Sequence, residues 1–463
     1  MKADAESNQA QGASMFASAE KIYPREMKGR FDKLSKLATI VLLGLFYVVP
    51  WLTWDDRQAV LFDLPARKFY LLGLTLWPQD FPYLAMLLII AALSLFFFTA
   101  LLGRVWCGFA CPQTVWTEAF IWMEQWTEGT RSQRMKLDKA PWSWNKLRRK
   151  GSKQFLWVTF SLWTGFTFVG YFVPVRELGS ELLTFSAGGW ATFWTVFYGF
   201  ATYGNAGYMR EQVCKYMCPY ARFQSAMFDK DTLIISYDEK RGEPRGSRKR
   251  GVDPQKLELG HCIDCTLCVQ VCPTGIDIRE GLQYECIACA ACIDACDSVM
   301  DKMNYPRGLV RYSTEHAMKE GETRILRPRI FVYATLLLIL VGGLVTSMAM
   351  RTPLILDVIR DRNFLFRELP DGEIENIYTL KIVNQRNDAQ TFRLSVDGVP
   401  GIELDGVAEL IAVDGGGVLS LPVRVRAPAD SAYGIMDVTF TVTDVDEPSI
   451  TMTEDSRFLG PTP

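Results

Sequence analysis

Five stretches of the chain are long and apolar enough to cross a bilayer, which takes about 20 residues at the helical rise. They cover residues 34–54, 83–103, 154–175, 187–209 and 330–350. The second and fifth contain no charged residue, and a buried helix of a soluble protein is rarely apolar on every face over that length. The pattern predicts a polytopic α-helical membrane protein with five spans, surrounded by membrane lipid. No apolar stretch precedes residue 34, so we expect no cleavable signal peptide.

Lysine and arginine are concentrated in two of the segments that flank these stretches. One group lies before and at the very start of the first stretch: Arg25, Lys28, Arg30, Lys33 and Lys36. The other lies between the second and third: Arg131, Arg134, Lys136, Lys139, Lys146, Arg148, Arg149, Lys150 and Lys153. Short flanks rich in Lys and Arg stay in the cytoplasm. We therefore expect a bacterial inner-membrane protein with a cytoplasmic N-terminus and a C-terminal segment exported to the periplasm.

The expected exported segment has the alternating pattern of β-strands. Short runs at residues 378–383, 391–396, 418–425 and 436–442 alternate apolar and polar side chains between Gly, Asp, Asn and Pro turns. About 100 residues with this spacing predict an immunoglobulin-like β-sandwich. The cysteine pair of antibody domains is missing, and such a module more often binds a partner than performs chemistry.

The overall net charge of −2 averages over two unlike parts. The last 113 residues carry 19 acidic and 10 basic side chains, whereas the first 350 residues carry 33 acidic and 40 basic side chains. The positive excess of the first part is modest and lies beside apolar stretches, so we expect no nucleic acid partner. The chain has two histidines, His261 and His316, which excludes bis-histidine haem and histidine-rich zinc or copper sites.

All twelve cysteines lie between the second and fifth apolar stretches, in segments expected in the cytoplasm. Disulfides would show the opposite distribution, so these thiols are expected to be reduced ligands or redox groups. Eight of them form two runs of the spacing C-x2-C-x2-C-x3-C, which is typical of two-cluster bacterial ferredoxins. In that motif the fourth cysteine of each run binds the other cluster. We therefore assign one [4Fe-4S] cluster to Cys262, Cys265, Cys268 and Cys296, and the other to Cys286, Cys289, Cys292 and Cys272. Zinc is the alternative, but a zinc ribbon uses pairs of cysteines and leaves a third in each run unexplained.

The other four cysteines form two C-x3-C-P motifs, Cys107 with Cys111 and Cys214 with Cys218, at equivalent places after the second and fourth stretches. Proline suits the first position of a helix, so Cys111 and Cys218 are expected at helix starts, where a thiolate is favoured. Residues 112–128 have the pattern of an interfacial amphipathic helix. These cysteines could simply be small buried residues at the ends of the spans. Two copies of one motif at equivalent places make that explanation weaker. The four thiols are candidates to bind copper(I) or to hold a third iron–sulfur cluster.

The motifs resemble those of the CcoG family, also called FixG or RdxA. The resemblance is carried by residues 104–116, 262–278, 281–297 and 311–315, and it extends over nearly the whole chain. Thr266 and Ala288 depart from the family's usual glycines, whereas Asp297 is expected. The resemblance implies an accessory protein for assembly of cbb-type cytochrome c oxidase that reduces Cu(II) to Cu(I). It makes Cys107, Cys111, Cys214 and Cys218 the catalytic, copper-binding thiols and the eight ferredoxin cysteines the electron relay.

The expected organisation has five parts. They are a cytoplasmic segment (1–33), a four-span membrane domain with both C-x3-C-P motifs (34–229), a cytoplasmic two-cluster ferredoxin-like domain (230–329), a fifth transmembrane helix (330–350) and a periplasmic immunoglobulin-like domain (351–463). Expected partners are a cytoplasmic electron donor, a copper chaperone or transporter, oxidase subunits and a second copy of the chain. Two other hypotheses remain: a ferredoxin module of a quinol-linked respiratory chain, and a non-enzymatic, redox-sensing assembly scaffold.

Overall fold

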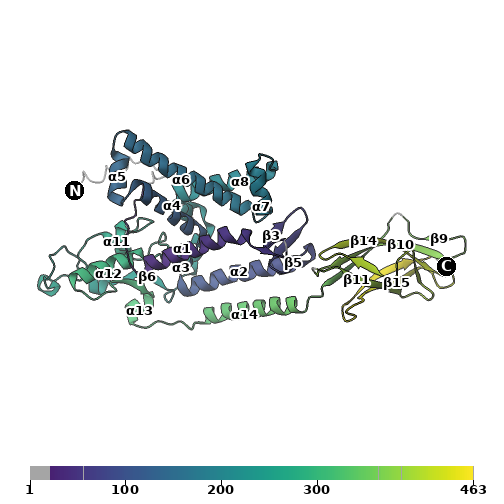
Figure 1. Cartoon of the computed structure of the whole chain (residues 1–463). Helices are drawn as coiled ribbons and strands as arrows, with labels where there is room; N and C mark the ends of the chain where they lie inside the picture. Colours follow the sequence, from purple (N-terminus) through teal and green to yellow (C-terminus); the bar gives the residue numbers. More distant parts are fainter. Residues whose placement is uncertain (1–20, 56, 363, 387, 462–463) are drawn as a thin grey trace, which may run out of the picture. The chain divides into compact units, whose positions relative to one another are not determined.

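The computed structural model describes residues 21–461 except positions 56, 363 and 387 (Figure 1). Most of the predicted segment 1–33 therefore lies outside the described residues. The chain divides into two compact units, Met1–Val341 and Gly342–Pro463. Each unit has a hydrophobic core of its own, and each is described by itself.

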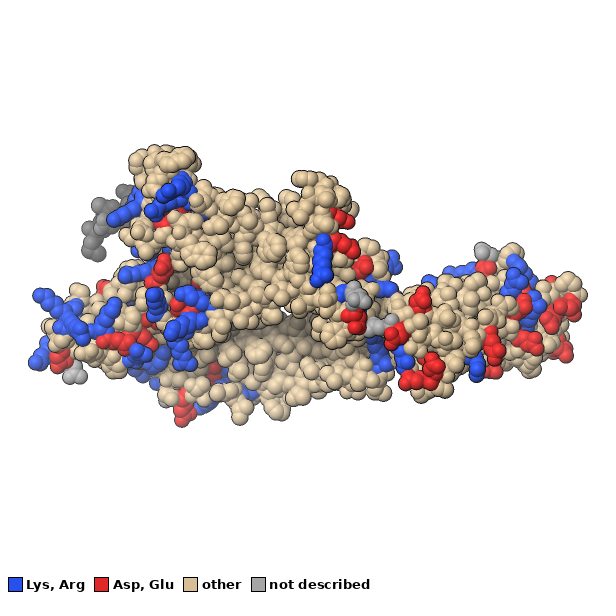
Figure 2. All heavy atoms as spheres, viewed as in Figure 1, with Lys and Arg blue, Asp and Glu red and all other residues tan. Residues whose placement is uncertain are grey.

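Three helices have the length and apolarity of membrane spans. They are α1 (Arg30–Val48), α2 (Phe81–Leu102) and α14 (Pro328–Ala349), and they correspond to the first, second and fifth predicted stretches. Their outward side chains are apolar, as at Ile40 and Leu88, which are 61% and 60% exposed. Figure 2 shows an uncharged band across the first unit, with Lys and Arg gathered at the end that carries α11 and α12. Such a surface indicates association with a membrane.

The third and fourth predicted stretches do not form helices of this kind. Helix α6 (Trp144–Val169) starts ten residues before the predicted span, and α8 (Gly189–Thr202) has 14 residues, about 21 Å at the helical rise. The chain continues from α8 as a π-helix, Tyr203–Met209. A side chain at Gly165 would lie 2.1 Å from the Thr195 carbonyl oxygen, so glycine lets α6 and α8 pack closely. The described residues thus contain three helices of membrane-span length and apolarity, and crossing of the membrane by the other two predicted stretches stays a prediction.

Short strands, which the sequence pattern does not reveal, connect α1 and α2. They are β1 (Thr53–Trp54), β2 (Arg57–Gln58), β3 (Val60–Asp63), β4 (Lys68–Leu71) and β5 (Leu74–Leu76). Strands β3, β4 and β5 pair antiparallel in that order. The Gln58 amide donates to the Gly170 carbonyl (2.7 Å) and accepts from the Val175 N–H (2.9 Å). These bonds attach the strand segment to the end of α6 and the start of α7 (Val175–Leu183).

Four shorter helices follow α2 and the π-helix. They are α3 (Val105–Phe109), α4 (Pro112–Glu128), α5 (Arg131–Lys139) and α9 (Pro219–Met227), the last preceded by a second π-helical turn, Val213–Met217. Helix α4 has the bounds that the sequence predicts. Its apolar face is buried in the protein, where the Phe120 and Trp157 rings lie 5.2 Å apart, while Trp126 at its end is 79% exposed.

The ferredoxin-like part is built on a two-stranded sheet, β6 (Ile234–Tyr237) with β7 (Val310–Ser313), and on α11 (Leu267–Gln270) and α12 (Ala291–Met303). The small helix α10 (Glu239–Gly242) follows β6, and α13 (Glu315–Glu320) follows β7. The buried Asp294 of α12 accepts from the Asp32 N–H (2.9 Å) in the first turn of α1. A carboxylate is favourable at a helix N-terminus, so Asp294 holds the ferredoxin-like part against the start of a membrane helix.

The second unit is the predicted β-sandwich. One sheet has the strand order β12 (Glu403–Asp405), β14 (Val418–Ala427), β10 (Ile374–Asn384), β8 (Leu354–Arg360), and the short strand β9 (Arg367–Glu368) also pairs with β10. The other sheet has the strand order β13 (Ile411–Val413), β11 (Gln390–Asp397), β15 (Ile435–Asp444), β16 (Thr451–Leu459). The four predicted strands are β10, β11, β14 and β15. Alternate residues of each strand point into one core, as at Tyr378, Leu380 and Ile382, all fully buried. The Tyr378 hydroxyl donates to the Arg457 carbonyl (2.9 Å) and so joins the two sheets.

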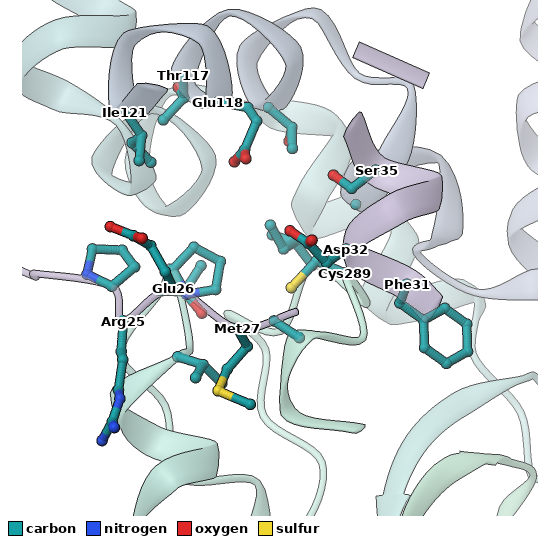
Figure 3. A pocket seen from close by; sticks show the side chains of 18 of the residues that line it. Arg25, Glu26, Met27, Phe31, Asp32, Ser35, Thr117, Glu118, Ile121 and Cys289 are labelled. Carbon is teal, nitrogen blue, oxygen red and sulfur yellow. The ribbon is translucent and has the colours of Figure 1, made fainter. Parts of the chain in front are cut away.

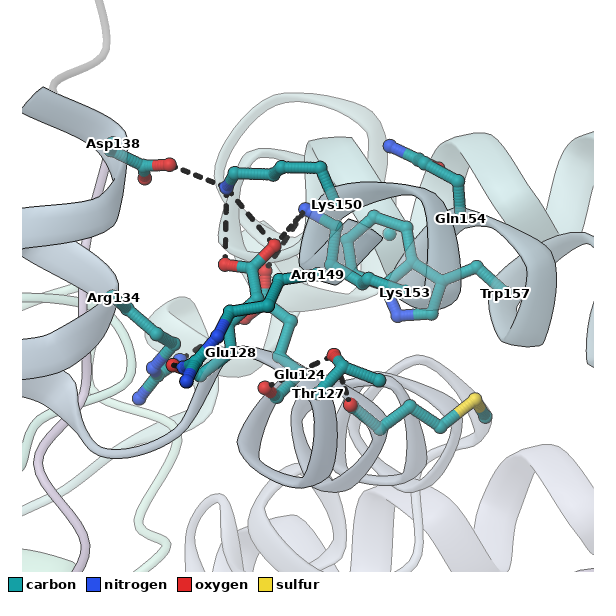
Figure 4. A network of polar contacts seen from close by, with 12 residues as sticks. Glu124, Thr127, Glu128, Arg134, Asp138, Arg149, Lys150, Lys153, Gln154 and Trp157 are labelled. Carbon is teal, nitrogen blue, oxygen red and sulfur yellow. Dashed lines mark hydrogen bonds and ion pairs between the residues drawn. The ribbon is translucent and has the colours of Figure 1, made fainter. Parts of the chain in front are cut away.

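A buried ion-pair network joins α4 to α5, α6 and the turn before the second π-helix (Figure 4). Glu124 pairs with Arg134 (3.1 Å) and Arg210 (3.0 Å), and Glu128 pairs with Lys153 (3.1 Å) and Lys150 (3.0 Å). Both carboxylates are at most 1% exposed. Burial by itself would raise the pKa of Glu124, but Arg210 and the nearby lysines outweigh it and lower the pKa below its usual range. The network therefore keeps the Glu124 carboxylate ionised inside the protein.

We expect Glu124→Ala to destabilise the protein by about 3–5 kcal/mol, because it leaves Arg134 and Arg210 buried without their partner. Thermal unfolding of the detergent-solubilised protein measures the change. As a control, Lys319→Ala breaks the exposed pair with Glu315 and should cost no more than about 1 kcal/mol. Equal shifts in the two variants would contradict a structural role for the network.

Candidate metal centres

Two small cavities in the ferredoxin-like part are each lined by a set of cysteines. Cys262, Cys265, Cys268 and Cys296 line the first, together with apolar side chains such as Leu309. Cys272, Cys286, Cys289 and Cys292 line the second, which Cys268 also reaches. Each cavity thus draws its fourth cysteine from the other run, which is the crossed arrangement expected from the spacing.

Left-handed backbone turns aim the thiols of each run into their cavity. Asp264 and Thr266 in the first run and Ala288 and Ala290 in the second all have positive φ, between 52° and 63°. Glycine adopts this conformation without strain, whereas a Cβ makes it cost about 1–2 kcal/mol. Glycine is therefore favoured at the positions of Thr266 and Ala288 because of the left-handed backbone, and not because a side chain would lack space there.

The chemistry of the two cysteine sets fits iron–sulfur clusters. Burial raises the pKa of Cys268 to about 11 and that of Cys296 to about 12, while Arg279 opposes the shift at Cys268. Such thiols carry protons until a metal displaces them. In the described part of the chain, no three Cys, His, Asp or Glu side chains are grouped as they would be around one metal ion. Thiols spread around a cavity suit a multi-iron cubane better than a single zinc ion.

Both C-x3-C-P motifs have the predicted local structure. Cys111 and Cys218 are extended, with φ of −63° and −80°, and each precedes a proline that starts a helix, α4 or α9. Cys107 lies in α3, and Cys214 lies in the second π-helical turn. The expectation of a favoured thiolate is wrong for Cys111. Burial raises its pKa, and the N–H groups of Gln113 and Thr114 oppose that shift without overcoming it.

The structure brings the four C-x3-C-P thiols into one neighbourhood. Burial, together with the negative charges that Cys111, Cys107 and Cys218 carry when ionised, raises the pKa of Cys214 to about 12. The pKa of Cys107 is raised to about 11 by burial and then by Cys111 and Cys218. Because charges act on one another this way only over short distances, the four thiols are neighbours.

Three polar side chains hold the two motifs together, and the sequence reasoning missed all three. Gln113 donates to the carbonyls of Asn205 (2.9 Å) and Arg210 (3.1 Å), and Gln224 accepts from the Cys107 thiol (3.3 Å). Arg104 donates to the Ala221 carbonyl in α9 (2.7 Å), to the Cys286 carbonyl (3.3 Å) and to the Tyr284 carbonyl. Gln113 directly follows the first motif and Arg104 lies three residues before it, and that proximity is the signal from which they could have been found.

The C-x3-C-P site abuts one of the ferredoxin-type cavities. A Cβ at Gly108, between Cys107 and Cys111, would lie 2.8 Å from the Ile287 carbonyl oxygen and 2.9 Å from that of Ala288. Ile287 and Ala288 form the loop between Cys286 and Cys289. The missing side chain at Gly108 therefore permits backbone contact between the two groups of thiols.

Comparison with known protein families agrees with this arrangement. A family model described as "4Fe-4S dicluster domain" matches residues 209–315, and one described as "4Fe-4S binding domain" matches residues 84–129. The model of the Ig-like fold at the C-terminus of FixG matches residues 344–461. Fold and site together define a membrane-associated redox protein with ferredoxin-type iron–sulfur centres and an immunoglobulin-like domain.

The chain belongs to the FixG–RdxA family. It is 41% identical to protein RdxB of Cereibacter sphaeroides (83% of this chain, 84% of that one) and 39% identical to protein RdxA of the same organism (91% and 93%). It is 37% identical to the nitrogen fixation protein FixG of Rhizobium meliloti (89% and 88%). A crystal structure of a FixG-related protein from Vibrio parahaemolyticus matches 23% of this chain and 95% of its own, at 38% identity and a TM-score of 0.22.

We expect Gly108→Ala to destabilise the protein by about 1–3 kcal/mol and to change the EPR signal of the reduced protein, because the new methyl group pushes the loop at Ile287 away. Thermal unfolding and EPR on the anaerobically purified protein measure both effects. Gly151→Ala is the matched control, since nothing lies within 4 Å of its added Cβ. A Gly108 variant with the stability and EPR signal of the wild type would contradict the close contact between Gly108 and the loop at Ile287.

Proposed function

We propose that the protein reduces Cu(II) to Cu(I) at Cys107, Cys111, Cys214 and Cys218, using electrons from two [4Fe-4S] clusters. In each turnover one reduced cluster gives one electron to one Cu(II) ion, and the thiols act as ligands without being oxidised. The observation that supports this most is the contact of Gly108 with Ile287 and Ala288. It provides a short connection from the loop of one cluster to the C-x3-C-P thiols.

The donor chemistry of the four thiols favours copper as the substrate. Soft thiolate sulfur selects Cu(I) among biological metals, so the reduced product is stabilised where it forms. The raised pKa values of Cys107 and Cys214 mean that binding the ion displaces protons, which links copper binding to pH. Copper capture also requires the four thiols to close in on the ion, because they are not grouped around a single-ion position in the described residues.

The topology and partners follow from the same proposal. The clusters and the C-x3-C-P thiols face the cytoplasm and the sandwich faces the periplasm, in agreement with the Lys and Arg gathered at the ferredoxin-like end of the first unit (Figure 2). A copper chaperone, a transporter or subunits of a cbb-type oxidase receive the Cu(I). The sandwich is the part suited to contact oxidase subunits, because it carries the acidic excess and no cysteine.

A second candidate function places a third iron–sulfur cluster at the C-x3-C-P thiols. The observation that favours it is the match of the "4Fe-4S binding domain" model to residues 84–129, which include Cys107 and Cys111 but none of the other cysteines. The protein would then pass electrons along three clusters to another acceptor rather than to copper.

We expect replacement of Cys107, Cys111, Cys214 and Cys218 by Ser to abolish Cu(II) reduction by the dithionite-reduced protein. The iron content should stay at about eight per chain, because the eight ferredoxin cysteines are intact. Absorbance of a Cu(I) chelator and iron analysis measure the two quantities. Cys265→Ser serves as the control in which the iron content per chain should fall, because it removes one of the eight ferredoxin cysteines.

The iron analysis separates the two candidates. A fall from about twelve irons in the wild type to about eight in the four-serine variant supports the third cluster. Copper reduction that persists in that variant overturns the proposed copper site.

A further inference from the structure

Two larger cavities of the first unit are not used by the proposed reaction, and they share the side chain of Trp122. The first, the head cavity, lies between residues 22–28, the first turns of α1, α4 and the loop that carries Cys289 (Figure 3). Its volume is about 220 Å³, just below the roughly 300–1,000 Å³ typical of small-molecule sites. The second, the tail groove, is an open groove of about 460 Å³ on α1, α4 and α6.

The head cavity reaches both groups of thiols. Cys289 of the second ferredoxin-type set, Cys214 of the second C-x3-C-P motif and Gly108 all line it. Figure 3 shows the Cys289 sulfur and the carboxylates of Asp32 and Glu118 directed into the same space. A molecule bound there would be next to a cluster ligand without displacing any cysteine.

The polar groups of the head cavity suit a small head with hydroxyl groups. The Glu118 carboxylate accepts from Trp122 Nε1 (2.9 Å), which leaves its remaining acceptor capacity for a ligand. Thr117 and Ser35 add hydroxyls to the lining. Asp32 is paired with Lys36 (2.8 Å), so Glu118 is the better acceptor for a ligand proton. Burial raises the pKa of Glu118, which makes it a stronger base than an exposed glutamate.

The tail groove has the opposite character. Its lining includes Leu43, Met123, Leu156, Phe160 and Trp163, and Thr159 is its one hydroxyl-bearing residue. Leu43 belongs to α1, a helix of membrane-span length and apolarity. The groove therefore offers a place for a hydrocarbon chain that comes from the lipid phase. Trp122 lines both spaces, so the head cavity and the tail groove adjoin each other at this side chain.

We propose that the head cavity and the tail groove together bind a membrane quinol, which is the electron donor of this protein. The proposal rests on the electron flow of the proposed function and names its source. Both O–H bonds of the quinol break, its two electrons reduce the two clusters by one electron each, and the molecule leaves as the quinone. One proton passes to the Glu118 carboxylate and the other to water at the open mouth of the head cavity.

A phospholipid is the competing occupant, since it also has a polar head and hydrocarbon chains. Its head is not redox-active, so it gives no reason for the cavity to touch Cys289 and Cys214. A quinol uses every feature of the site: the apolar groove, the hydrogen-bonding head cavity, the nearby carboxylate and the adjacent cluster ligand.

The test uses the full-length holoprotein in lipid nanodiscs under anaerobic conditions, with decylubiquinol and a short-chain menaquinol as donors. We expect each of the two probes, or the one of lower potential, to bleach the cluster absorbance of the wild type. Leu43→Trp fills the groove and should raise the half-saturating quinol concentration by about tenfold, the effect of roughly 1.4 kcal/mol. Leu45→Trp is the matched control, because Leu45 is 56% exposed on the same helix and does not line the groove.

Glu118→Gln tests the head cavity, with the exposed Glu177→Gln as its control. We expect Glu118→Gln to slow bleaching by quinol and to leave bleaching by dithionite and iron content unchanged, which distinguishes a quinol defect from misfolding. Absence of bleaching by both quinols in the wild type overturns the proposal, as does an equal effect of Leu43→Trp and Leu45→Trp. Copper reduction driven by dithionite is measured separately, so failure of the copper proposal and failure of the quinol proposal give different results.

Discussion

The close backbone contact at Gly108 is the constraint on which the rest of the first unit depends. The first C-x3-C-P motif reaches the loop between Cys286 and Cys289 because no side chain intervenes. Arg104 stabilises the same contact, since its buried guanidinium joins carbonyl oxygens of the cluster loop and of α9. A charge buried at that position is acceptable because several carbonyl oxygens accept its hydrogen bonds. The proposed electron transfer between the two groups of thiols rests on this contact.

Helix α4 organises the surroundings of that contact at both of its ends. Its N-terminus follows Cys111, and Gln113 in its first turn is bonded to the turn before Cys214. Its C-terminal half carries Glu124 and Glu128, whose buried pairs extend to α5, α6 and Arg210. One helix thus connects the C-x3-C-P site to the buried ion-pair network. Residues between these ends line both the head cavity and the tail groove.

Local features of the fold were predictable where the chain pattern alone decides them. Uninterrupted apolar stretches gave α1, α2 and α14, and alternation with turn residues gave β10, β11, β14 and β15. Crossing of the membrane by the third and fourth stretches stays a prediction. These stretches are apolar and aromatic, and glycine and threonine on the facing sides of α6 and α8 let the two helices pack closely. The strands β1 to β5 are too short for their alternation to be recognised.

The sequence by itself determined the ligand chemistry of this protein: twelve cysteines in two ferredoxin runs and two C-x3-C-P motifs, with no histidine-rich alternative. Spacing carries this information because the thiols of one motif lie on one turn or loop. Only the tertiary structure decided which motifs meet, since Gly108 and Ile287 are far apart in the chain and their contact depends on close packing. The same holds for Glu118, Trp122 and Cys289, which no motif connects and which surround one cavity only after the chain has folded.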